Sequence, residues 1–126
     1  MNESGDQTIE RIVAAVACGF AVNPNAVQAQ LEGGTIDGLS TALGLEITVN
    51  DGRVVQRNFT DYPLMKIDRV PALFEAHILN YDDTPTGVGE IGPPPAAPAL
   101  TNAIFDATGI RIRKLPIADQ IKEEMT

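Results

Sequence analysis

The sequence predicts an α+β domain with a mixed sheet and two main helices, in the order β-α-β-β-β-α-β. Short runs of β-branched and aliphatic residues have the length of strands. Two longer segments begin at proline and are expected to be helices. The first carries apolar residues at helical spacing, and the second ends at a glycine. With 126 residues, of which 44% are apolar, the chain can bury one core. We therefore expect a single domain over 1–126, with its core at about 8–117 and polar tails at 1–7 and 118–126.

A strand followed by a long helix is predicted first. Thr8–Cys18 is rich in Ile and Val and indicates a buried strand. Asn23 is a good N-cap before Pro24, so a helix is expected over about Pro24–Leu43. Three glycines lie inside this helix, and each costs about 1 kcal/mol relative to alanine. They are Gly33, Gly34 and Gly38. Another backbone or a bound group should therefore approach this helix closely.

Three strands should come next. Leu45–Val49 and Arg53–Val55 flank Asp51-Gly52, a pair that supplies the positive φ of a tight hairpin turn. Asn58–Tyr62 could extend the second of these strands. Leu73–Leu79 is a further predicted strand, with its apolar side chains on one face and Glu75 and His77 on the other.

A long irregular segment is predicted before the second helix. Tyr81–Ala97 holds three glycines and four prolines, and its composition excludes regular structure. Pro98–Thr108 is expected to be a helix that ends at Gly109, a left-handed cap position. Ile110–Leu115 is predicted as the last strand, followed by a charged tail.

Charge and cysteine content exclude several classes of function. The net charge is −8 and no dense basic cluster exists, which argues against nucleic acid and against anionic membrane surfaces. The single cysteine, Cys18, allows no internal disulfide and no cysteine-based metal site. The polar, acidic start lacks the features of a secretory signal. We expect a cytoplasmic chain, or a periplasmic one if a partner carries the export signal for both.

Few side chains are candidates for chemistry when each is considered by itself. His77 is expected to be an ordinary strand residue, because one histidine offers too few ligands for a metal site. Cys18 is expected to be a small buried residue. Asp82-Asp83 could bind a cation, but a solvated turn is the simpler interpretation. Gly87-x-Gly89-x-x-Gly92 matches a dinucleotide-binding pattern by letter only, since prolines and not a helix follow it.

Glu90 differs from these residues because of its neighbours. It lies between Gly89 and Gly92, and small residues allow a backbone to come close to a ligand. The prolines that follow stiffen the segment and hold one carboxylate in place, as a general base requires. Local composition alone remains a weak signal for catalysis.

Several motifs, taken together and in order, resemble one family. They are Val16-Ala17-Cys18-Gly19-x-x-Val22-Asn23-Pro24, Gln28-x-Gln30-Leu31-Glu32-Gly33-Gly34, Gly38-Leu39-Ser40-x-Ala42-Leu43, Asn58-Phe59-x-Asp61-Tyr62-Pro63, Gly87-Val88-Gly89-Glu90-x-Gly92, Ala97-Pro98-Ala99-Leu100-x-Asn102-Ala103-Ile104 and Ala107-Thr108-Gly109-x-Arg111-Ile112-Arg113-x-Leu115-Pro116. This pattern covers residues 9 to 117. It resembles the carboxy-terminal segment of molybdopterin-binding subunits in the xanthine oxidase/aldehyde oxidoreductase family, and is most like the β-subunits of isoquinoline 1-oxidoreductases.

The resemblance implies roles for three residues. Glu90 falls on the family's Gly-x-Gly-Glu glutamate, the general base beside the molybdenum. Gln30 falls on the glutamine that contacts the pterin, and Gly89 shapes the loop of the base. The implied cofactor is molybdopterin with molybdenum, in its cytosine dinucleotide form and only in an assembled complex; none is expected for the isolated chain. The implied partners are a larger molybdopterin-binding chain and an iron–sulfur subunit.

Two departures from the family pattern leave alternatives open. Ala17 stands where the family commonly has Asp, and most of the subunit is missing, so the chain alone should not bind the cofactor well or turn over substrate. The chain is then a fragment or split subunit of a molybdenum hydroxylase that oxidises aldehydes or N-heterocycles. The first alternative is a stand-alone relic without catalysis, a binding or assembly module that forms a homo-oligomer when isolated. The second is an unrelated α+β domain that binds a small molecule.

Overall fold

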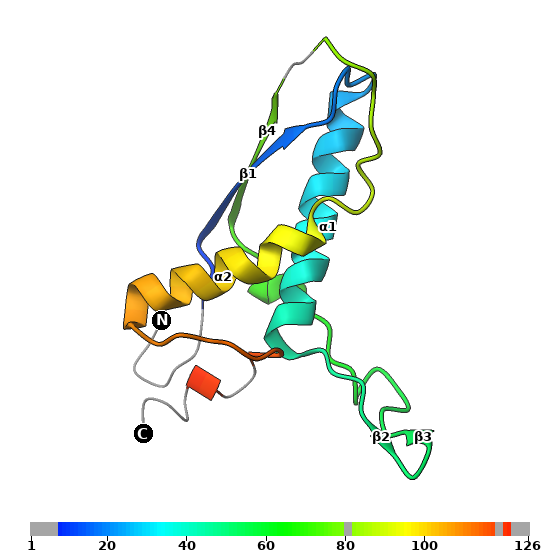
Figure 1. Ribbon diagram of the computed structural model, residues 1–126, viewed down its shortest axis with the longest axis vertical. Coiled ribbons are helices and arrows are strands. Elements are labelled where there is room, and N and C mark those ends of the chain that lie inside the picture. The colour runs from blue at the N-terminus through cyan, green and yellow to red at the C-terminus, as the bar shows by residue number, and fades with distance from the viewer. Residues whose placement is uncertain (1–7, 80–81, 118–119, 122–126) are drawn as a thin grey trace.

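Two parallel strands and two crossing helices form the body of this computed structural model, which describes residues 8–79, 82–117 and 120–121 (Figure 1). Strand β1 (Arg11–Ala17) pairs in parallel with β4 (Leu73–Leu79), from Arg11 opposite Leu73 to Ala17 opposite Leu79. The predicted strand Leu73–Leu79 is confirmed. The first strand is also confirmed, but it is half-buried and not buried as expected, since Val13 on its outer face is 54% exposed.

The long helix α1 (Pro24–Gly44) begins where the sequence predicts and ends one residue later. The side-chain oxygen of Asn23 accepts a hydrogen bond from the backbone N–H of Ala26 at 3.2 Å. This bond satisfies one of the N–H groups that a helix start leaves without a partner.

Replacement of Asn23 by alanine is expected to lower the free energy of unfolding by about 1 kcal/mol, because the cap bond is lost. Urea denaturation followed by circular dichroism measures this change. Asn25→Ala is the control, since Asn25 is an exposed residue within the same helix. Equal losses in the two variants would contradict the capping role of Asn23.

A small hairpin projects beyond the carboxyl end of α1 (Figure 1). Its strands β2 (Val49–Asn50) and β3 (Arg53–Val54) are antiparallel, and Asp51 and Gly52 at the turn have φ of 47° and 73°. The predicted hairpin is therefore confirmed, although each strand has only two residues. Asn58–Tyr62 forms turns and bends and does not extend the strand. A single 3-10 turn, η1 (Ile67–Arg69), precedes β4.

The second helix, α2 (Pro93–Thr108), starts five residues earlier than the sequence analysis placed it. The prolines at 93, 94 and 95, expected in an irregular segment, occupy its first turn. They fit there because the first N–H groups of a helix have no partner inside the helix, so proline loses nothing. The predicted end is confirmed: Gly109 has φ of 76°, and its N–H donates to the carbonyl of Phe105 at 2.8 Å.

The predicted last strand, Ile110–Leu115, is wrong: the described residues after α2 form no strand. Its alternating apolar pattern comes from packing and not from strand pairing. Ile112 is buried in the core beside α1 and α2, while Arg111 lies over the ring of Phe105, 3.4 Å from the centroid. Ile121, in the expected polar tail, is buried too, at 1% exposed.

The α+β class with two helices is confirmed, and both parallel and antiparallel pairing occur. Among the described residues these pairings form two separate two-stranded sheets and not one mixed sheet. Two buried clusters lie along α1. One joins its carboxyl half to α2 and the segment that follows it, and the other joins its amino half to β1 and β4. No described helix is long and apolar enough to cross a bilayer.

Candidate functional site

The segment from Asp82 to Gly92 runs back along the amino half of α1 on its way to α2 (Figure 1). Backbone hydrogen bonds tie its beginning to the turn between β1 and α1. Phe20 N–H donates to the Asp83 carbonyl and Thr86 N–H donates to the Cys18 carbonyl, both at 3.0 Å. Gly19 in that turn has φ of 70°, and a Cβ there would overlap the carbonyls of Asp83 and Thr84.

The other end of the segment lies directly on the backbone of α1. A Cβ built on Gly92 would be 2.5 Å from the Thr35 nitrogen and 2.9 Å from the Leu31 carbonyl oxygen, closer than real side chains approach. A Cβ on Gly38, one turn further along α1, would be 2.8 Å from the Cα of Pro93. The close approach expected from the helix glycines is confirmed at this position, and the approaching group is the backbone at the start of α2.

Side chains in the middle of the segment divide between the core and the surface. Val88 and Ile91 pack against the cluster that holds Val16, Cys18, Val27 and Leu31. Gly89 and Glu90, which lie between them, are exposed in a turn. The segment is therefore fixed by two apolar anchors and by backbone contacts at both ends. Glu90 has little freedom to change its backbone position.

The structure places the three residues singled out from the sequence in one region. A Cβ on Gly89 would lie 3.6 Å from Nε2 of Gln30, so the turn that carries Glu90 sits beside the Gln30 amide. Gln30 is exposed on α1, and among the described residues neither its side chain nor that of Glu90 has a hydrogen-bond partner. Both polar groups are available to a ligand or to another chain.

The remaining candidates have ordinary surroundings. Cys18 is 3% exposed, as expected of a small core residue. His77 is exposed on the outer face of β4, with Nε2 3.9 Å from a carboxylate oxygen of Glu75. Arg11 donates to Glu75 at 2.6 Å, and this hydrogen bond lowers the pKa of the Glu75 carboxyl and raises the pKa of Arg11. Among the described residues, no group of three or more His, Cys, Asp or Glu could hold a metal ion.

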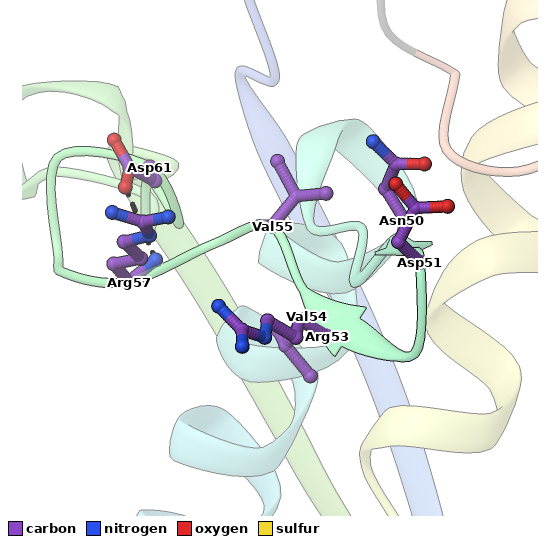
Figure 2. Close-up of a pocket in the computed structure, with 7 residues that line it drawn as sticks. All are labelled: Asn50, Asp51, Arg53, Val54, Val55, Arg57 and Asp61. Carbon is purple, nitrogen blue, oxygen red and sulfur yellow. Dashed lines mark hydrogen bonds between the residues drawn. The ribbon is translucent and has the colours of Figure 1, made fainter.

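A surface hollow beside the hairpin is separate from this region. Figure 2 shows it lined by Asn50, Asp51, Arg53, Val54, Val55, Arg57 and Asp61. The backbone N–H of Arg57 donates to the Asp61 carboxylate at 3.1 Å, which ties the segment after β3. The hairpin lies beyond the carboxyl end of α1, whereas the Glu90 segment runs along its amino half (Figure 1). The hollow therefore does not contribute to the candidate site.

The candidate site is thus an exposed turn with one carboxylate that lies beside an exposed glutamine amide. Residues 2–71 match the family described as molybdopterin cofactor-binding domain. The chain belongs to this family.

Two curated relatives extend the match over most of the chain. It is 34% identical to one of the subunits of the nicotinate dehydrogenase of Pseudomonas putida over 114 residues, covering 90% of this chain and 10% of the relative. It is 36% identical to the β-subunit of the isoquinoline 1-oxidoreductase of Brevundimonas diminuta over 110 residues, covering 87% of this chain and 14% of the relative. The chain thus spans a small part of the length of the relatives it matches.

Solved structures show the same fold inside much longer chains. The aldehyde oxidoreductase from Desulfovibrio desulfuricans superposes with a TM-score of 0.84 at 25% identity, over 98% of this chain and 14% of that one. Quinoline 2-oxidoreductase from Pseudomonas putida 86 gives a TM-score of 0.85 at 21% identity, over 98% and 17%. The resemblance to the xanthine oxidase/aldehyde oxidoreductase family is confirmed.

Proposed function

We propose that this chain supplies one wall of a molybdopterin site, together with the general base Glu90, to a larger chain that completes a molybdenum hydroxylase. The observation that carries the proposal is the contact of the Gly89–Glu90 turn with the Gln30 amide, 3.6 Å from a Cβ built on Gly89. Gln30 and the Gly89–Glu90 turn, which are far apart in the sequence, lie side by side at one exposed place, and the surrounding domain belongs to a molybdopterin-binding family.

The residues at this place fit a flat polar group such as a pterin. The Gln30 amide can both donate and accept hydrogen bonds, as the edge of a pterin requires. Gly33 is one turn further along the same face of α1, and a Cβ there would have nothing within 4 Å. Gly89 likewise brings no side chain into the space beside Gln30. A planar ring system can thus approach the helix and the turn closely.

We propose Glu90 as the residue that accepts a proton. General acid–base catalysis requires a group held within hydrogen-bond reach of the proton that moves. Val88 and Ile91 anchor the turn that carries Glu90, and the Glu90 side chain is exposed. The bound cofactor would supply two-electron oxidation, and Glu90 would take a proton in the same reaction.

The family membership suggests the rest of the assembly. We propose molybdopterin in its cytosine dinucleotide form as cofactor. The proposed partners in the cytoplasm are a larger molybdopterin-binding chain and an iron–sulfur subunit. The relatives named for nicotinate and isoquinoline point to aromatic N-heterocycles as substrates, with aldehydes as the second class.

Assembly with the larger chain is the experiment that tests this function. The two chains are co-expressed from the source genome and purified through a tag on this chain, and molybdenum content and dye-linked oxidation of N-heterocycles and aldehydes are measured. A molybdenum-containing, active complex is expected. A stable, metal-free chain that never associates with the larger chain would instead support the relic without catalysis.

Gln30→Leu is expected to lower the molybdenum and pterin content of the purified complex several-fold, because the amide that binds the pterin edge is lost without a large change in side-chain size. Gln28→Leu is the matched control, since Gln28 is exposed on α1 two residues away and points to another side of the helix. Metal and pterin are quantified per complex by mass spectrometry and fluorescence. Equal cofactor content in both variants would rule out the pterin contact.

A further inference from the structure

One edge of β1 has no neighbouring strand among the described residues. Among the described residues β1 pairs with β4 alone, so its other edge carries backbone N–H and C=O groups without strand partners. Parallel strands are usually found deep inside larger sheets, covered on both faces. A two-stranded parallel sheet with one face exposed is therefore an incomplete unit.

An apolar groove runs along this edge. It has a volume of about 240 Å³ and lies between β1 and the two helices. Ile12 and Val13, which point to opposite faces of β1, both line it, so the groove follows the edge of the strand and not one face. Its helical side is formed by small and aliphatic residues, among them Leu31, Ala96 and Ala99.

The one hydroxyl in the groove is already satisfied. Thr35 Oγ1 donates to the Leu31 carbonyl at 2.7 Å. The groove is therefore complementary to aliphatic side chains, and the strand edge can form backbone hydrogen bonds with another strand. An extended peptide with alternating apolar residues would fill the groove and hydrogen-bond to the edge, as in strand addition to an open sheet edge.

The related proteins are much longer than this chain, and their additional length could supply such a peptide. In the two solved structures this fold covers 98% of the present chain but only 14% and 17% of theirs, so most of each related chain lies outside the equivalent of this domain. We infer that the free edge of β1 and the groove beside it bind an extended segment of the larger molybdopterin-binding chain as a third strand. This inference rests on the proposed function and names the surface through which the two chains join.

Ala99→Glu tests the inference, because it places a charge in the groove at an exposed position of α2. Affinity for the co-expressed larger chain is expected to fall by roughly 100-fold, since burial of an unpaired charge is strongly unfavourable. Ala103→Glu is the matched control: Ala103 is exposed one turn later on α2 and does not line the groove. The control should bind like the original chain. Circular dichroism checks that both variants are folded.

Amide hydrogen exchange of β1 separates strand addition from other modes of association. Exchange at alternate amides of Arg11–Ala17 should slow by at least about tenfold in the complex, because these N–H groups gain partners. Binding with unchanged exchange and full tolerance of Ala99→Glu would overturn the third strand while the split-subunit function stands. Absence of any binding would overturn the proposed function itself. Protection of β1 in a homodimer of this chain would show that a second copy occupies the edge, against the inference.

Discussion

Glu90→Gln is expected to lower the turnover of the assembled enzyme by roughly 10²–10⁴-fold, the usual contribution of a general base. Glutamine keeps the size of the side chain but cannot take up a proton at working pH. Because Val88 and Ile91 anchor the turn through their own packing, the substitution should not change its position. Molybdenum content should therefore remain that of the original complex, while kcat falls.

Asp82→Asn is the control for this experiment, because Asp82 is an exposed carboxylate in the same segment and lies eight residues before Glu90. It should leave kcat within about twofold, as expected of a surface change away from the reacting groups. Steady-state oxidation is followed with an artificial electron acceptor over a range of pH. Equal turnover in Glu90→Gln and the original complex would exclude Glu90 as the base.

Gly38→Ala is expected to lower the free energy of unfolding by about 1–3 kcal/mol, the cost of forcing extra volume into a packed contact. The added Cβ would be 2.8 Å from the Cβ of Ala96 and 2.8 Å from the carbonyl oxygen of Pro93, so α1 and α2 must move apart. Chemical denaturation of the chain measures the loss.

Gly33→Ala gives the opposite sign and serves as the control. Gly33 is also inside α1, but a Cβ there would have nothing within 4 Å. The alanine should raise the free energy of unfolding by about 0.5–1 kcal/mol, because it lowers the entropy of the unfolded chain and favours the helix. If both variants change the free energy of unfolding in the same direction, the close contact between α1 and α2 is not the reason that position 38 requires glycine.

Local signals in the sequence were sufficient where one residue type determines the conformation. Asn23-Pro24 located the start of α1, Asp51-Gly52 the hairpin turn and Gly109 the end of α2. The glycines in α1 even predicted a close approach. What local signals could not provide was the identity of the approaching segment, because it depends on a contact between residues nearly 60 positions apart.

Two of the wrong predictions followed from composition considered without tertiary context. By composition the prolines before residue 98 predict irregular chain, although the first turn of a helix accepts them. The alternating residues after Gly109 predict a strand, but no partner strand lies beside them among the described residues, and Ile112 is buried against helices instead. The alternating apolar pattern correctly predicts that Ile112 is buried, but wrongly predicts that the segment pairs with another strand.

The candidate site could be predicted only in combination. Glu90 in a Gly-Pro-rich segment was a weak candidate by itself, and Gln30 had no distinguishing local feature. The ordered motifs made both residues stronger candidates, and the structure places the Glu90 turn beside Gln30. Gly92 did not stand out for its own contact. Its role is visible only once the backbone of α1 is found within 2.5 Å of its missing Cβ.

The proline-filled first turn of α2 also affects how an anion could be recognised here. Helix starts commonly bind phosphates, because their first N–H groups point outward with the positive end of the helix dipole. Residues 93 to 95 have no N–H to offer. The start of α2, although it lies two residues after Ile91 and close to Glu90, is thus poorly suited to bind a phosphate of a dinucleotide cofactor. If the chain contributes to such a site as proposed, N–H donors outside the first turn of α2 must bind the phosphate.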